Sequence, residues 1–131
     1  MIDFSHEIFT AIATLVREEH GPIAVIGENV SQPAQFPCVA IDEIYNIPSH
    51  LDSSSAEMYS AVTYRVQVFC AGESKRAQAR AIFKTVSDAC WCLNLIRKTF
   101  TTTPDVYNSS VYCITATFEA DIRADGTIFR R

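Results

Sequence analysis

One stretch of the sequence, residues 62–93, changes its hydrophobic period halfway and so defines two neighbouring elements. Its first part, VTYRVQVFC, alternates apolar and polar residues, the pattern of a β-strand with one wetter side. After Gly72, where Ser74 can cap a helix, apolar residues recur with the period of an amphipathic helix. They are Ala79, Ile82, Phe83, Val86, Cys90 and Leu93. A strand, a turn and a helix in this order predict a helix that packs against a sheet.

Shorter patterns place the elements of the N-terminal part of the chain. Residues 8–20 carry apolar side chains at helical spacing and stop at Gly21-Pro22, which predicts a first amphipathic helix. The run FPCVAIDEIY (36–45) predicts a strand that is buried on much of both faces. Residues 23–35 fit either a short strand or a loop.

The C-terminal part of the chain indicates a strand meander. Residues 97–103 are rich in β-branched side chains, and VYCITATFEADI (111–122) alternates between apolar and polar residues. Asp125-Gly126 is typical of a two-residue hairpin, because a type I′ turn needs positive φ at both positions. The element order predicts a single α+β domain over residues 1–131. In it, two helices pack on one face of a mainly antiparallel sheet of about four to five strands.

The polar segment 46–60 separates two of the predicted strands. It contains Pro48 and three consecutive serines from Ser53, and it is too long for a tight hairpin. Such a segment buries little apolar surface, so we expect a mobile, arm-like loop that becomes ordered against a neighbouring subunit or another partner. Its apolar residues are the candidate anchors for that contact: Ile47, Leu51, Met58 and Tyr59.

Charge and composition limit the kinds of partner that the chain can have. The formal net charge of −4 disfavours nucleic acid or an anionic membrane as the main partner. No apolar stretch has the roughly 18 residues that a membrane-spanning helix needs, and the acidic start MIDFSHEIF differs from a signal peptide. We therefore expect a cytoplasmic protein. In that reducing compartment the five cysteines are expected to be reduced, metal-free and buried like small hydrophobic residues.

The sequence carries no pattern that supports catalysis or metal binding. The turn at Gly72 lacks the second glycine and the lysine spacing of a phosphate-binding loop. None of the three histidines has a histidine or cysteine three or four residues away, as a zinc site would need. Glu119 and Asp121 share a strand face, but alternating acids are ordinary on a wet strand face and the sequence shows no histidine, lysine or metal motif beside them. We therefore expect no catalytic site, no metal and no cofactor.

The second predicted helix begins with an unusual set of cations. They are Lys75 and Arg76 in its first turn, followed by Arg80 and Lys84 on the Arg76 face. Cations at a helix N-terminus oppose its partial positive charge, so a nearby anionic group would offset their cost. One interpretation is a solvated face that Glu73 and Asp88 partly balance. The other is a docking surface for acidic groups of a neighbouring subunit, for which Glu119 and Asp121 are candidates.

The order of the predicted elements in several parts of the sequence is similar to that of one known protein family. These parts are FPCVAIDEIY, the serine-rich arm, YRVQVFCAGESKRAQARAIFKTVSDAC and VYCITATFEADIRADGTIFRR, which together cover roughly residues 36–131. Taken together they resemble the tail terminator, or tail-completion, proteins of long-tailed bacteriophages. The resemblance implies a small α/β protein that assembles as a ring, typically a hexamer, on the last ring of the tail tube.

The resemblance also implies a function without catalysis. A protein of this family ends tail polymerisation and forms the interface to the head connector, so the expected partners are other copies of the chain, the tail tube protein and the head–tail connector protein. The expected location is the virion tail or neck, reached from the host cytoplasm, with no membrane and no specific nucleic acid as partner. Another neck or tail-tube subunit is an alternative, and a small cytosolic enzyme is a further one. A tube subunit should polymerise into long cylinders by itself, whereas a terminator should stop at single rings.

Overall fold

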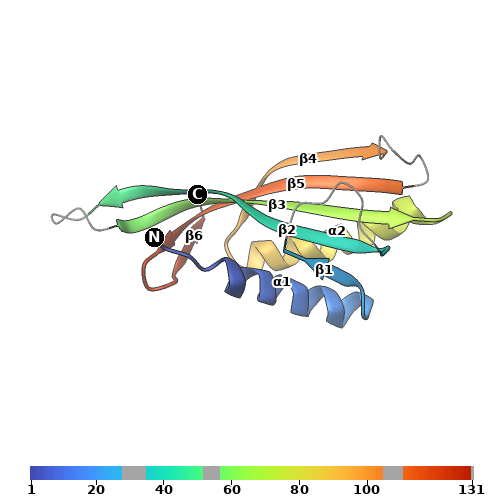
Figure 1. Ribbon diagram of the computed structural model, residues 1–131, viewed down its shortest axis with the longest axis horizontal. Coiled ribbons are helices and arrows are strands. Elements are labelled where there is room, and N and C mark those ends of the chain that lie inside the picture. Colours follow the sequence, from blue (N-terminus) through green and yellow to red (C-terminus); the bar gives the residue numbers. More distant parts are fainter. Residues whose placement is uncertain (28–34, 52–56, 105–110, 131) are drawn as a thin grey trace.

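The computed structural model describes residues 1–27, 35–51, 57–104 and 111–130, which form two helices and six strands (Figure 1). The helices are α1 (Ser5–His20) and α2 (Lys75–Cys92). The strands are β1 (Ala24–Ile26), β2 (Cys38–Leu51), β3 (Glu57–Ala71), β4 (Ile96–Pro104), β5 (Val111–Arg123) and β6 (Ile128–Arg130). They form one sheet in the order β1-β2-β3-β5-β4, and β6 pairs with β5.

The α+β class and the two helices agree with the expectation, whereas the sheet differs from it. It has six strands and is mixed, because β1 runs parallel to β2 with Ala24 opposite Cys38. The four other strand pairings are antiparallel. The sequence left residues 23–35 open because three strand residues are too few to show a period.

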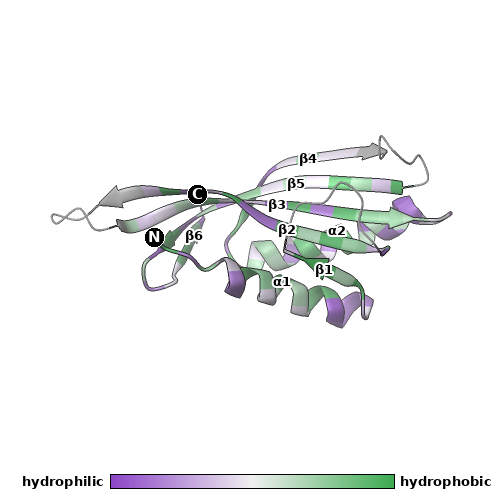
Figure 2. Ribbon diagram, viewed as in Figure 1, coloured by the Kyte–Doolittle hydropathy of each residue, from purple (hydrophilic) through white to green (hydrophobic). Residues whose placement is uncertain are grey.

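The main hydrophobic core lies between the sheet and the two helices, which cover the same face of the sheet (Figure 1). The alternation predicted for residues 62–70 and 111–122 sends every second side chain into this core. Its most deeply buried members include Ile12, Val16, Val39, Val62, Tyr64, Val66, Val68, Ile82, Val86, Ile114, Phe118 and Ile122. Figure 2 shows hydrophobic residues along much of the sheet and within the helices. Burial of the apolar side of α2 in this core stabilises the packing of the helix on the sheet.

The opposite face of the sheet, here called the open face, is mostly polar. Arg65 forms an ion pair with Asp42 on β2, with 3.3 Å between Nη2 and Oδ2. Thr99 and Thr117 share a hydroxyl hydrogen bond of 2.8 Å between β4 and β5. One end of this face carries a small apolar cluster instead: Cys38, Ala40, Phe69, Val111 and Cys113. The wetter strand side that the alternation predicts is therefore present.

The prediction of a long loop over residues 46–60 was wrong for residues 46–51 and 57–60. These residues continue β2 and β3 as a paired ribbon, with Ile47 opposite Ala61 and His50 opposite Tyr59. The remaining part of that segment, residues 52–56, lies outside the described residues. In Figure 1 the ribbon extends past the start of α1.

This segment forms strand because polar residues can make the backbone hydrogen bonds of a β-ladder as well as apolar residues can. Ser60 is buried and its hydroxyl donates to Asn46 Oδ1, while Asn46 Nδ2 donates to the carbonyl oxygen of Ile2 at 2.7 Å. Pro48 is tolerated because the register shifts directly after it, between Pro48 and His50. Backbone pairing and this buried polar network therefore order a segment whose composition predicted a loop.

Candidate interaction surface

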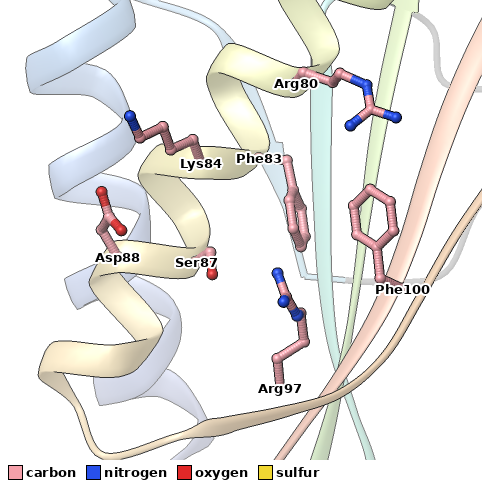
Figure 3. A pocket seen from close by; sticks show the side chains of 7 residues that line it. All are labelled: Arg80, Phe83, Lys84, Ser87, Asp88, Arg97 and Phe100. Atoms are coloured by element: carbon pink, nitrogen blue, oxygen red, sulfur yellow. The ribbon is translucent and has the colours of Figure 1, made fainter.

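A pocket of about 400 Å³ opens between α2 and β4, and we call it the α2–β4 pocket (Figure 3). It is lined by Arg80, Phe83, Lys84, Ser87, Asp88, Arg97 and Phe100. Five of these residues come from α2 and two from β4. The helix stripe positions the α2 side chains, and the pairing of β4 with β5 places Phe100 opposite Ala116.

Two phenylalanines form the apolar wall of the pocket. Phe83 is buried in the main core, and its ring centroid lies 5.1 Å from that of Phe100. Phe100 is 37% exposed and belongs to the edge strand. An exposed aromatic ring that rests on a buried one can bury further area against a partner. Phe100 is therefore the apolar contact point of this surface.

Two arginines from different elements approach the same ring. The guanidinium carbon of Arg80 lies 5.8 Å from the Phe100 centroid, and that of Arg97 lies 5.9 Å from it. Figure 3 shows both side chains directed toward the space beside Phe83 and Phe100. Within the described residues neither arginine forms an ion pair, and Asp88 is the only acid among the residues that line the pocket. Two guanidinium groups around one ring favour an anionic partner, with the ring as the planar contact for it.

The structure separates the cations that the sequence placed on one helix face. Arg76, Arg80 and Lys84 are exposed on α2, and Lys75 is half-buried. Arg80 reaches toward Phe100, whereas Lys84 points toward α1 (Figure 3). Lys84 also lines a second pocket of about 400 Å³ between the helices, together with Leu15 and Glu19.

The candidate acids Glu119 and Asp121 lie on the open face. Their neighbours Phe118, Ala120 and Ile122 point into the core beneath the helices, so alternation turns both acids the other way. The structure therefore does not bring these acids together with the α2 cations within one copy. The two sets occupy opposite sides of the sheet.

The candidate anchors of the arm lie on the β2–β3 ribbon. Ile47 is 57% exposed, Met58 is exposed, and Tyr59 makes an edge-to-face contact of 5.9 Å with Phe129. Leu51 is the last residue of β2. The register puts Ile47, Tyr59 and Phe129 on the open face, together with Tyr45, which is 60% exposed. An aromatic and aliphatic patch thus forms at this end of the open face.

Sequence reasoning missed Arg97 and Phe100 in the α2–β4 pocket, and it missed Tyr45 and Phe129 in the apolar patch. Arg97 and Phe100 meet α2 only through the strand order. The cation–aromatic pattern RKTF at the start of β4 is the signal that could have found them. Tyr45 and Phe129 are brought near the arm residues by pairing across three strands, for which the local sequence holds no signal.

A third pocket, of about 430 Å³, lies between the start of α1 and β2, and we call it the α1–β2 pocket. It is lined by Ser5, His6, Phe9, Gly27, Ile41, Asp42, Glu43 and Tyr64. The Tyr64 hydroxyl donates a hydrogen bond of 2.9 Å to Glu43 Oε1. Burial, followed by the negative charges of Glu43, Asp3 and Glu7, holds the pKa of Tyr64 far above its usual value. Acidic side chains therefore lie near this pocket.

The cysteines and the remaining acids show no arrangement typical of a redox or metal site. Four of the five cysteines are buried, as expected, and Cys92 is exposed. Burial raises the pKa of Cys90 to about 12 and that of Cys70 to about 11, which suppresses their thiolate forms. In the described part of the chain no three histidine, cysteine, aspartate or glutamate side chains gather closely enough to hold a metal. The described helices include none of the length and apolarity that a bilayer crossing requires.

The fold is similar to that of one chain in a solved structure titled "Virion of native gene transfer agent (GTA) particle". The two chains superimpose with a TM-score of 0.63 and share 15% sequence identity, over 92% of this chain and 94% of the other. No family model matches the sequence. No curated protein matches it either. At this level of identity the comparison identifies the fold of the chain.

Proposed function

We propose that the chain is a structural subunit of a phage-like virion that caps the tail tube as a ring, ends tail polymerisation and forms the interface to the head connector. The observation that carries the virion role is the likeness in fold, over nearly the whole length of both chains, to a chain of a gene transfer agent virion. The capping role rests on the resemblance of residues 36–131 to tail terminator proteins. Both lines of argument point to a protein that acts through its surfaces.

The distribution of surfaces supports a ring of identical copies. The α2–β4 pocket offers cations and an exposed ring, whereas other parts of the chain offer acids and the apolar patch on the open face. A chain that carries two different, complementary surfaces associates head to tail, and such contacts close into a ring when the rotation between copies allows it. Exposed ion pairs contribute only about 0–1 kcal/mol each, so a stable ring must also bury apolar area.

The β2–β3 ribbon is the part of the chain that we assign to contacts outside the ring. Tyr45 and Ile47 are more than half exposed on it, and solvent-exposed side chains of this size contribute most when a partner covers them. The tail tube is the partner that the capping role implies. Replacing Tyr45 and Ile47 by serine should leave the protein folded and weaken its attachment to tubes.

The second candidate function is that of another neck or tail-tube subunit. Its supporting observation is the same likeness in fold, since the virion title does not distinguish among the components of the particle. The two candidates differ in where assembly stops. A tube subunit adds copies along an axis without limit, whereas a cap exposes a final ring to which no further copy binds.

Light scattering and negative-stain electron microscopy of the purified chain across a concentration series test the proposal. We expect a mass that levels off at one ring and single rings in images. Long cylinders would favour the tube subunit. A strictly monomeric chain at every concentration, both alone and mixed with tail tubes, would contradict a ring-forming role altogether.

A further inference from the structure

We propose that the α2–β4 pocket receives the acidic edge of a second copy of this chain, which we define as Asp3, Glu7 and Glu43 around the α1–β2 pocket. This inference rests on the proposed ring and names the contact that builds it. Glu119 and Asp121 are then not the acids that the basic helix meets.

The strand order places the two surfaces at opposite edges of the molecule. β4 is the last strand on one side of the sheet, and β1 and β2 are the last two on the other. The α2–β4 pocket lies at the first edge, and the α1–β2 pocket lies beside β2 at the second. Both pockets are on the helix-covered side, since each is lined by a helix (Figure 1). Copies placed side by side can therefore bring one edge onto the other without turning over.

The charges of the two edges are complementary. Arg80 and Arg97 flank Phe100 in the α2–β4 pocket and form no ion pair within the described residues. Among the described residues that line the α1–β2 pocket there is neither lysine nor arginine, and Glu43 supplies a negative charge there. Asp42 also lines the pocket, but its carboxylate is already paired with Arg65 on the open face.

Two further acids extend the negative edge toward solvent. Asp3 and Glu7 are both exposed, and Asp3 Oδ1 accepts hydrogen bonds from the backbone amide and the hydroxyl of Ser5. Asp3 is thereby held in a fixed position at the start of α1, and Glu7 follows in the first turn of the same helix. A guanidinium group of the next copy would be attracted to both.

The open face of a second copy is a less suitable partner for the α2 cations than the acidic edge. Glu119 and Asp121 lie on the side of the sheet away from the helices, among polar strands that include Arg65. To reach the α2–β4 pocket of a neighbour, that face would have to stack over the helix layer. Stacking of this kind builds a column, whereas contact between opposite edges can close into a ring when the rotation between copies allows it.

Charge reversal of the pocket, and removal of the two exposed acids of the edge, test the proposal. The pocket variant is Arg80→Glu with Arg97→Glu, and the edge variant is Asp3→Asn with Glu7→Lys, in which asparagine keeps an acceptor at the start of α1. A matched control, Arg17→Glu with Arg123→Glu, changes the net charge as much as the pocket variant at exposed positions outside both surfaces. Circular dichroism and thermal unfolding establish that each variant is folded. If the pocket variant does not fold, Arg80→Gln with Arg97→Gln replaces it.

We expect each variant alone to need at least a tenfold higher concentration for half-assembly, while the control assembles like the unmodified chain. Mixing the two variants in equal amounts should restore assembly in part, because every second contact of an alternating ring is native and the others set the two introduced glutamates against an edge that has lost Asp3 and Glu7 and gained a lysine. Assembly of either variant alone at the unmodified concentration would overturn the inference and leave the proposed ring intact. A mixture that assembles no better than either variant alone would also overturn it, since the two surfaces would then not meet each other. An unmodified chain that stays monomeric at every concentration, both alone and mixed with tail tubes, would overturn both the ring and this contact.

Discussion

The contact between Arg130 and Trp91 fastens the short C-terminal strand to the end of α2. The guanidinium carbon of Arg130 lies 3.8 Å from the centroid of the Trp91 ring, and Arg130 Nη2 donates to the carbonyl oxygen of Trp91 at 3.2 Å. β6 has only three residues and pairs with β5 at Ala120, Asp121 and Ile122. We therefore expect Arg130→Ala to loosen this strand and to destabilise the protein.

The magnitude follows from the two parts of the contact. An exposed cation–π pair contributes about 0.5–1 kcal/mol. A hydrogen bond to a carbonyl in the last turn of a helix, together with the helix dipole, adds about 0.5–1 kcal/mol at a solvent-exposed position. Arg130→Ala should thus lower the free energy of unfolding by about 1–2 kcal/mol. For a chain of this length that corresponds to a fall in Tm of about 4–7 °C.

Thermal unfolding followed by circular dichroism measures this change, and Trp91 supplies a local probe because it is the only tryptophan in the chain. Trp91 is 55% exposed, so loss of the stacked guanidinium should alter its emission in the folded state. Arg123→Ala, at another exposed arginine of the same sheet, is the control, with an expected fall in Tm below about 2 °C. Arg130→Lys should recover only part of the loss because an ammonium group does not stack in the same way. A Tm for Arg130→Ala within error of the Arg123→Ala value would refute the reasoning.

Three further predictions concern the turns, the buried tyrosine and the thiols. Gly126→Ala should lower the free energy of unfolding by about 1–3 kcal/mol, since Gly126 has φ of 94° and a Cβ there would lie 3.1 Å from the Phe4 ring. Gly72→Ala should lower it less, because Gly72 has φ of 100° but open space around it. Equal losses for the two variants in urea unfolding would count against the steric argument. Because the pKa of Tyr64 is raised in the folded state, its contribution to stability is fully present below pH of about 10 and declines above it, where only the unfolded chain ionises. Tyr64→Phe should therefore lose stability at pH 7 and show a shallower decline between about pH 10 and 12, and an unchanged slope would contradict this. Thiol labelling of the native protein should modify Cys92 rapidly and the four buried cysteines only on unfolding, and fast labelling of more than one thiol would disagree with the burial.

Periodicity was sufficient for the elements whose faces differ in polarity. The stripe from Ala79 to Cys90 predicted α2, and the alternation over 111–122 predicted β5, because one side of each is buried against the core. The hairpin after Arg123 formed around Asp125-Gly126 as predicted, but not as a two-residue type I′ turn. Gly126 has positive φ and Asp125 does not, and the Arg123 amide donates to the carbonyl oxygen of Thr127 across three intervening residues. These features depend on local chemistry alone.

Other features depend on contacts between distant residues, and the sequence could not supply them. Ser60 can be buried because its hydroxyl is hydrogen-bonded to Asn46, which in turn donates to the carbonyl oxygen of Ile2. These contacts allow a polar stretch of the sequence to form strand. The α2–β4 pocket was only half predicted for the same reason. Arg80 was identified from its place on the helix, but Arg97 reaches the same ring only because β4 pairs with β5 at the edge of the sheet.

The pairing of β3 with β5 has a consequence for the order in which the chain folds. Residues that face each other in this ladder are between 40 (Ala71 and Val111) and 64 (Tyr59 and Arg123) positions apart. Closing such long loops is entropically costly, so chains rich in distant pairings fold in about milliseconds to seconds and not in microseconds. A nascent chain cannot complete its central ladder until β5 has left the ribosome, and until then the apolar side of β3 has only earlier elements to cover it. We therefore expect the time between synthesis of β3 and of β5 to be the period in which this chain is most vulnerable to aggregation.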